Sequence, residues 1–161
     1  MRGKGSFGSR VLRVLLAPVL LLLLILLLLV LPFYLVYRLL LRIAVELVWG
    51  LRGRRILLVY SRSPIWQEYV ETNWLPRLGK TAVVLNWSDR SAWRRRDSLT
   101  VWVFRHWAPS RNFNPMALLF PPLRPTRQIS FYRAFHDWKQ GKIEALRVAE
   151  SELFSFAKSL E

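Results

Sequence analysis

The stretch ILLVYSRSPIWQEYVETNWLPRLGKTAVVLNW, residues 56–87, contains the pattern that decides the fold. It opens with a short apolar, branched run at residues 56–60, which is typical of a strand covered on both faces. Ser63 and Pro64 then form a helix start, with Ser63 as the N-cap and Pro64 at the first helical position. A second buried strand is predicted at residues 81–87. Strand, helix and strand within about 30 residues predict a βαβ unit with two parallel strands.

Three more strands and a closing helix are predicted after this unit. Residues 98–107 carry Thr and Trp at alternating positions and are predicted to form a third strand. Two shorter strands are expected at residues 116–120 and 128–132, on either side of a proline-rich link. Between residues 143 and 160 apolar side chains recur every three or four positions, which indicates an amphipathic helix. We therefore expect an α/β fold, with a small mixed sheet of about five strands and a C-terminal amphipathic helix.

A charge-free apolar run precedes this domain. Residues 14–37 read VLLAPVLLLLLILLLLVLPFYLVY and, as a helix, extend about 36 Å. The hydrocarbon core of a bilayer is roughly 30 Å thick. The run is longer than the core of a signal peptide, which spans about 7–15 residues, and no small-residue cleavage site follows it. We therefore expect a retained transmembrane helix and not a cleaved signal.

Two arrangements of the N-terminal part remain open at this point. In the first, a single helix spans the membrane and a basic amphipathic helix follows it. In the second, Pro32 marks a turn, and residues 11–31 and 33–51 form a helical hairpin. The expected segments are a basic flank at 1–13, the transmembrane segment at 14–37, the juxtamembrane helix or second hairpin arm at 38–55, and the α/β domain at 56–161.

The chain is strongly basic, with 25 Lys and Arg against 10 Asp and Glu. Nine of the basic residues and one acid, Glu46, lie in residues 1–55. A basic surface suits an anionic membrane as well as nucleic acid. Because the chain also carries an anchor, we expect a bilayer with anionic headgroups, or another membrane protein, as the partner, and no nucleic acid. Positive charge prefers the cytoplasmic side, so we expect the domain in the cytoplasm, at a plasma membrane or bacterial inner membrane.

Polar side chains follow the two strands of the βαβ unit. In open α/β sheets, ligands bind beyond the carboxyl ends of parallel strands, and a helix start there offers free N–H groups to an anion. The same residues also suit helix caps and a solvated loop, and the glycines of a phosphate-binding loop are missing. The candidate anion-binding residues are Ser61, Arg62, Ser63, Asn86, Ser88, Asp89 and Arg90.

A second set of residues suits contact with lipid headgroups. Arginine attracts anionic lipids, and tryptophan favours the membrane interface. The candidates for this surface are Arg38, Arg42, Arg52, Arg54, Arg55, Trp93, Arg94, Arg95 and Arg96.

Residues that carry catalysis are scarce. The chain has no cysteine and two histidines, His106 and His136, in unrelated segments, so we expect no metal site and no cofactor. No nucleophile elbow appears, which favours a protein that is not an enzyme. The sequence therefore predicts a membrane-anchored protein with a cytoplasmic basic α/β domain for binding or interaction. The alternative is a membrane-tethered enzyme or sensor with a phosphorylated or nucleotide ligand at the 61–63/86–90 edge.

Overall fold

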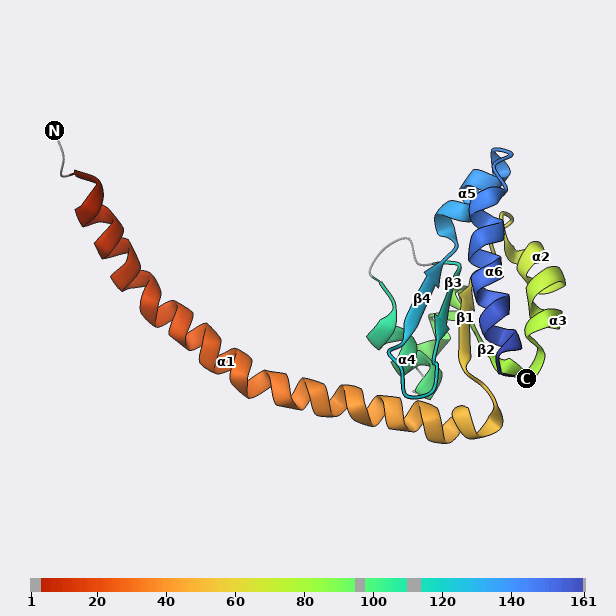
Figure 1. Ribbon diagram of the computed structural model, residues 1–161, viewed down its shortest axis with the longest axis horizontal. Helices are drawn as coiled ribbons and strands as arrows, with labels where there is room; N and C mark the ends of the chain where they lie inside the picture. The colour runs from red at the N-terminus through yellow and green to blue at the C-terminus, as the bar shows by residue number, and fades with distance from the viewer. Residues whose placement is uncertain (1–3, 95–97, 110–113, 161) are drawn as a thin grey trace. The chain divides into compact units, whose positions relative to one another are not determined.

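A computed structural model describes residues 4–94, 98–109 and 114–160 of the chain (Figure 1). The chain divides into two compact units, Met1–Ile43 and Ala44–Glu161. The first unit consists of most of helix α1 (Lys4–Val48), and the last residues of this helix belong to the second unit. The second unit holds a four-stranded sheet and the remaining helices, which confirms the α/β class.

Helix α1 continues through both of its prolines, Pro18 and Pro32. The alternative of a hairpin that turns at Pro32 is therefore wrong. A proline removes a single backbone donor, and leucine is a good helix former on both sides of it, so the helix continues. The segment Leu16–Arg52 is long and apolar enough to cross a membrane, and none of its most apolar window is buried within the protein.

The sheet of the second unit is mixed, in the order β2-β1-β3-β4. β1 pairs with β2 in parallel, and β3 is antiparallel to both of its neighbours. The parallel pair confirms the βαβ unit. The strands are β1 (Ile56–Tyr60), β2 (Ala82–Asn86), β3 (Met116–Leu119) and β4 (Arg127–Ser130).

A helical segment joins β1 to β2. It consists of α2 (Gln67–Tyr69), the π-helical turn η2 (Val70–Trp74), α3 (Leu75–Leu78) and the 3-10 turn η3 (Gly79–Thr81). The helix begins at Gln67, three residues after the predicted start at Pro64. Ser63 still satisfies backbone donors, because its Oγ accepts from Ile65 at 3.3 Å and its carbonyl accepts from Gln67 at 2.9 Å. The buried Trp66 has a φ of −135°, outside the helical region, and this places the helix start after it.

The predicted third strand at residues 98–107 is wrong, because this segment forms helix α4 (Leu99–Trp107). Ser98 caps the helix, and its Oγ accepts from the Val101 N–H at 3.4 Å. Val101 and Phe104 are both buried, three residues apart, as a helix face requires. Since this strand is lost, the sheet has four strands and not five.

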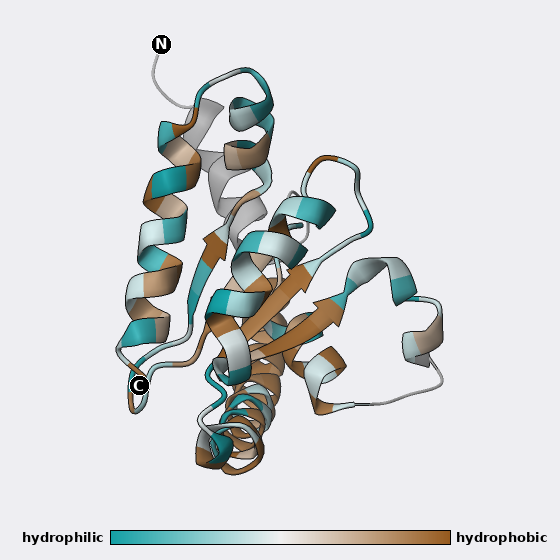
Figure 2. Cartoon of the chain, turned by 90° about the vertical axis from the view of Figure 1, so that its right-hand side faces the viewer, coloured by the Kyte–Doolittle hydropathy of each residue, from teal (hydrophilic) through white to brown (hydrophobic). Residues whose placement is uncertain are grey.

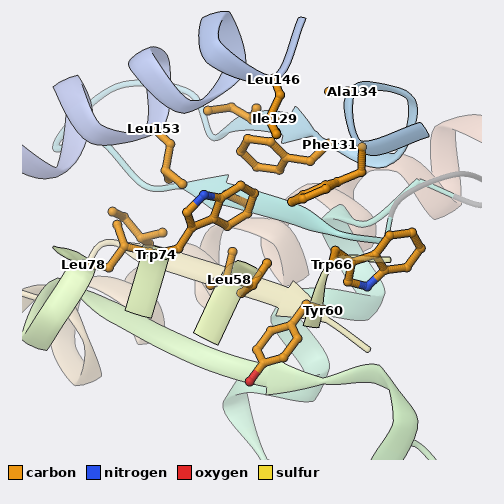
Figure 3. Close-up of a cluster of buried hydrophobic side chains, with 14 of the residues drawn as sticks. Leu58, Tyr60, Trp66, Trp74, Leu78, Ile129, Phe131, Ala134, Leu146 and Leu153 are labelled. Carbon is orange, nitrogen blue, oxygen red and sulfur yellow. The ribbon is translucent and has the colours of Figure 1, made fainter. Parts of the chain in front are cut away.

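One face of the sheet is covered by α5 (Tyr132–Lys139), α6 (Glu144–Lys158) and the helical segment between β1 and β2. Figure 3 shows Trp74 at the centre of this core, between the sheet residue Leu58 and the α6 residues Leu146 and Leu153. The Trp74 ring lies 4.4 Å from that of Phe131. The buried side chains of α6 confirm the predicted amphipathic C-terminal helix.

On the other face the side chains of the two central strands, β1 and β3, are buried as well, whereas Gln128 and Ser130 of the edge strand β4 are exposed. Leu57 and Leu118, which alternate with the residues of the first face, have no exposed surface. On this side Phe120 contacts two rings edge to face, that of Trp49 at 5.9 Å and that of Trp107, at the end of α4, at 5.5 Å. Figure 2 accordingly shows the central strands in brown, the hydrophobic colour, within helices of mixed colour. The domain is therefore a sheet between two layers.

Candidate functional site

The predicted anion-binding residues meet at one end of the sheet. Tyr60, the last residue of β1, is the register partner of Asn86, the last residue of β2. The loops that follow, residues 61–63 and 86–90, therefore lie together at the carboxyl edge of the parallel pair. This juxtaposition is the one that the βαβ pattern predicts.

The polar groups of this carboxyl edge bind mainly one another. The backbone N–H of Arg62 donates to Ser88 Oγ at 2.9 Å, and the Ser88 N–H donates to Asn86 Oδ1 at 2.9 Å. The Arg62 guanidinium forms an ion pair with Asp89 at 3.0 Å. Arg90 lies over the ring of Trp87, 5.5 Å from its centroid. The Arg62–Ser88 hydrogen bond and the Arg62–Asp89 ion pair thus hold the two loops together.

Carboxylates also border this edge. A shallow cavity of about 320 Å³ beside Ser63 is lined by Glu68 and Glu71 as well as by Pro64 and Thr72. Both carboxylates repel an anion at short range. The electrostatics of the cavity therefore favour a cation or a neutral group over phosphate.

Two tyrosines near the core are held in the neutral form. The Tyr60 hydroxyl donates to Glu71 Oε1 at 3.0 Å. Burial, followed by the hydrogen bond and charge of Glu71, raises the pKa of Tyr60 to about 12. Burial, followed by the hydrogen bond and charge of Glu150, raises the pKa of Tyr69 to about 12. At neutral pH both hydroxyls are therefore protonated.

The predicted lipid-contact residues fall into different environments. Arg38 and Arg42 lie on α1, and Arg52 and Arg54 are exposed before β1. Arg55 is turned inward, where its guanidinium pairs with Glu46 at 2.7 Å and is 18% exposed.

The tryptophan of the predicted lipid-contact set belongs to the core. Trp93 is 9% exposed, and its ring packs against Trp87 at 5.4 Å and Phe104 at 5.5 Å. The ring is therefore buried on the α4 side of the sheet and does not lie on the surface. The side chain of Arg94 and the whole of Arg95 and Arg96 lie outside the described residues.

A cationic surface lies at the opposite end of the sheet, where β1 and β2 begin. The Arg55 N–H donates to the Thr81 carbonyl at 3.0 Å, and the Phe120 N–H donates to the Arg55 carbonyl at 2.9 Å. These bonds bring together the segment before β1, the turn before β2 and the loop between β3 and β4. The exposed cations of this surface, which we call the basic edge, are Arg52, Arg54, Lys80, Arg124 and Lys158.

The end of α6 reaches the same basic edge. A groove of about 550 Å³ is lined by the β3–β4 loop (Pro121, Pro122, Arg124, Pro125), by Arg127 at the start of β4, and by the α6 end (Phe156, Ser159, Leu160). Figure 1 likewise shows this loop and the C-terminus at the end of the sheet where β1 begins. Among the described residues, two carboxylates that border the edge are paired with arginines, Glu46 with Arg55 and Glu152 with Arg127. The charge presented by the basic edge is therefore strongly positive.

The sequence did not predict three residues of the basic edge: Lys80, Arg124 and Lys158. Each is a single cation in its own segment, so no local charge cluster marks it. The strand order was the signal that could have found them, because a parallel β1–β2 pair and an antiparallel β3 place their flanking loops at one end.

No protein-family model and no curated protein matches the sequence, and no solved structure matches the chain. Among residues 4–94, 98–109 and 114–160, no three His, Asp or Glu side chains come close enough to hold a metal ion. The function is therefore inferred from the geometry and the charge of the two ends of the sheet.

Proposed function

We propose that the chain is a membrane-anchored protein whose α/β domain holds its basic edge against the anionic surface of the membrane that α1 crosses. The domain acts there as a binding or interaction module for lipid headgroups and for a neighbouring membrane protein. One observation carries the proposal. Five exposed cations, Arg52, Arg54, Lys80, Arg124 and Lys158, lie at the end of the sheet where the chain enters the domain from its long apolar helix.

Electrostatics supports this arrangement. A basic side chain near an anionic leaflet contributes about 1 kcal/mol, an attraction that fades within a Debye length of about 8 Å at physiological salt. Arg52 and Arg54 follow α1 within six residues of its last residue, Val48, so an anchored helix keeps them close to the headgroups. An anchor also makes the contact intramolecular, so weak individual contacts are sufficient.

Charge at the ends of the helix supports a cytoplasmic domain at a plasma membrane or bacterial inner membrane. A continuous helix crosses the bilayer once, so one basic flank lies on each side. Five arginines follow the apolar run before β1, against four basic residues that precede it, and the more basic side prefers the cytoplasm.

The alternative, a phosphorylated or nucleotide ligand at the carboxyl edge, receives less support from the geometry. Arg62 is paired with Asp89, and the adjoining cavity is lined by two glutamates. A ligand there would have to break the ion pair or approach the carboxylates. Within the described part of the chain, no exposed cation of the basic edge forms an ion pair.

Topology and lipid contact test the proposal separately. For topology, single cysteines replace Ser6 and Ser159 and are probed with a membrane-impermeant thiol reagent in intact cells; the natural chain has no cysteine. We expect labelling at residue 6 alone. Labelling at residue 159 would place the domain outside the cell, and protection at both positions would contradict a single span.

For lipid contact, amide hydrogen exchange of the full chain is measured in nanodiscs of phosphatidylglycerol and of phosphatidylcholine. We expect slower exchange of residues 50–55 and 120–127 in the anionic discs. In a variant with glutamine in place of Arg52, Arg54 and Lys80, the exchange rates in the two lipids should become equal. A control variant with glutamine in place of the exposed residues Arg133, Lys139 and Lys142 should keep the difference between the two lipids. Equal exchange in both lipids would contradict the proposal.

A further inference from the structure

The tip of the β3–β4 loop holds a leucine in an unusual conformation. Leu123 has a φ of +53°, in the left-handed region that bulky L-residues rarely adopt. Leu123 is fully exposed, so no described part of the protein covers it. Glycine or asparagine adopts this backbone conformation at lower cost and keeps apolar surface out of water. A strained and fully exposed apolar side chain points to contact with something outside the chain.

The loop presents this leucine rigidly. Pro121, Pro122 and Pro125 flank it, and each proline ring fixes its φ near −65°. Pro121 is buried, and the Arg124 N–H donates to its carbonyl at 3.4 Å, which closes a turn around Leu123. Because the loop is ordered before it binds, little conformational entropy is lost on contact.

Charge around the tip identifies the kind of surface that it meets. Arg124, next to Leu123, is exposed and forms no ion pair with any described residue. Phe120, where the loop begins, is hydrogen-bonded to Arg55, so the loop leaves the sheet beside Arg52 and Arg54. Leu51, in the same stretch before β1, is 79% exposed. Apolar side chains among arginines match the interface of an anionic bilayer, where the apolar group enters the acyl boundary and the arginine binds phosphate.

We propose that the β3–β4 loop is a second membrane contact, in which Leu123 inserts into the interface of an anionic bilayer and Arg124 binds the lipid phosphates. This inference rests on the proposed function, because α1 must hold the domain at the membrane. It assigns to the domain a fixed orientation on the bilayer, with the basic edge facing lipid and the carboxyl edge of the sheet facing away.

The test places a probe at the tip in the full chain. Cysteine replaces Leu123, an environment-sensitive fluorophore is attached, and the protein is reconstituted into vesicles that contain phosphatidylglycerol. Quenching by lipids with a nitroxide at a shallow acyl position is compared with quenching by aqueous iodide. The control carries the same probe at Val148, an exposed apolar residue on α6. We expect several-fold stronger lipid quenching at position 123 than at position 148, and protection from iodide at position 123 alone.

Each other outcome overturns the inference. A probe at position 123 that iodide reaches as readily as the probe at position 148 shows that the tip lies in water. A probe that is protected from both quenchers shows that the tip binds protein and not lipid. Extraction of the same vesicles at alkaline pH separates the two proposals: release of the chain rejects the anchor and the inference, whereas retention with a tip in water rejects the inference alone.

Discussion

The guanidinium of Arg55 lies 2.7 Å from the carboxylate of Glu46, and the same nitrogen donates to the Phe120 carbonyl at 3.3 Å. Glu46 is the single acid of residues 1–55, and it sits in the last turns of α1. The pair therefore joins the end of that helix to the residue that precedes β1 and to the loop that follows β3. It fixes the segment that carries Arg52 and Arg54.

Gly50 makes room for this pair. A Cβ at position 50 would lie 2.8 Å from Glu46 Oε2 and 3.1 Å from Arg55 Nη2. We expect Gly50→Ala and Glu46→Gln each to lower the free energy of unfolding by roughly 1 kcal/mol, the scale of a partly exposed ion pair. Because both changes remove the same interaction, the double variant should lose less than the sum.

Chemical denaturation in detergent, followed by tryptophan fluorescence, measures these losses. Arg54→Ala serves as the control, because Arg54 is exposed and a surface change away from special features costs little. Additive losses in the double variant would show that Gly50 acts independently of the pair.

The pKa of Tyr60, raised to about 12, makes stability depend on alkaline pH. In the unfolded chain tyrosine ionises near pH 10, so between about pH 10 and 12 the unfolded state binds fewer protons than the folded state. The free energy of unfolding should therefore fall as the pH rises through this window. In Tyr60→Phe the free energy of unfolding should fall less, because one of the two tyrosines with a raised pKa has been removed.

Denaturation curves at pH 9 to 12 test this, together with the absorbance of tyrosinate. Tyr132→Phe is the matched control. The same slope in Tyr60→Phe as in the natural chain would show that Tyr60 does not cause the loss.

The helix at Leu99–Trp107 predicts a position-dependent response to proline. At Leu99, the first helical residue, proline should cost about 1 kcal/mol or less, because that N–H has no partner in the helix and Ser98 is already extended. At Arg105, exposed and later in the helix, proline should cost about 3 kcal/mol. The thermal midpoints of the two variants measure the difference, and equal destabilisation would contradict a helix that begins at Leu99.

Relief of strain at Leu123 should stabilise the fold. Leu123→Gly removes a left-handed conformation that costs an L-residue roughly 1–2 kcal/mol, so the free energy of unfolding in detergent should rise by about 1 kcal/mol. Val148→Gly, in the interior of α6, should lower it by about 1 kcal/mol. Denaturant titration of both variants provides the comparison, and a loss of stability in Leu123→Gly would show that the leucine makes contacts within the fold.

The sequence by itself determined the elements with a strong local pattern. The leucine run produces a helix because nothing in it competes with helical structure, and residues 56–87 produce a βαβ unit because two buried strands flank a helix start. The amphipathic period of α6 is the same kind of local signal. The strands predicted at residues 116–120 and 128–132 are found at 116–119 and 127–130, and α5 begins at Tyr132, inside the second predicted strand.

Tertiary structure decided what local patterns leave open. Residues 98–107 carry an alternating pattern that predicts a strand, but Leu99–Trp107 forms helix α4, with Val101, Val103 and Phe104 buried. Trp93, which was predicted to lie at the lipid surface, is buried against Phe104 of that helix. The basic edge exists because strand order and direction bring three distant segments to one end of the sheet, where α6 also ends, and a charge pattern read along the chain contains no such information.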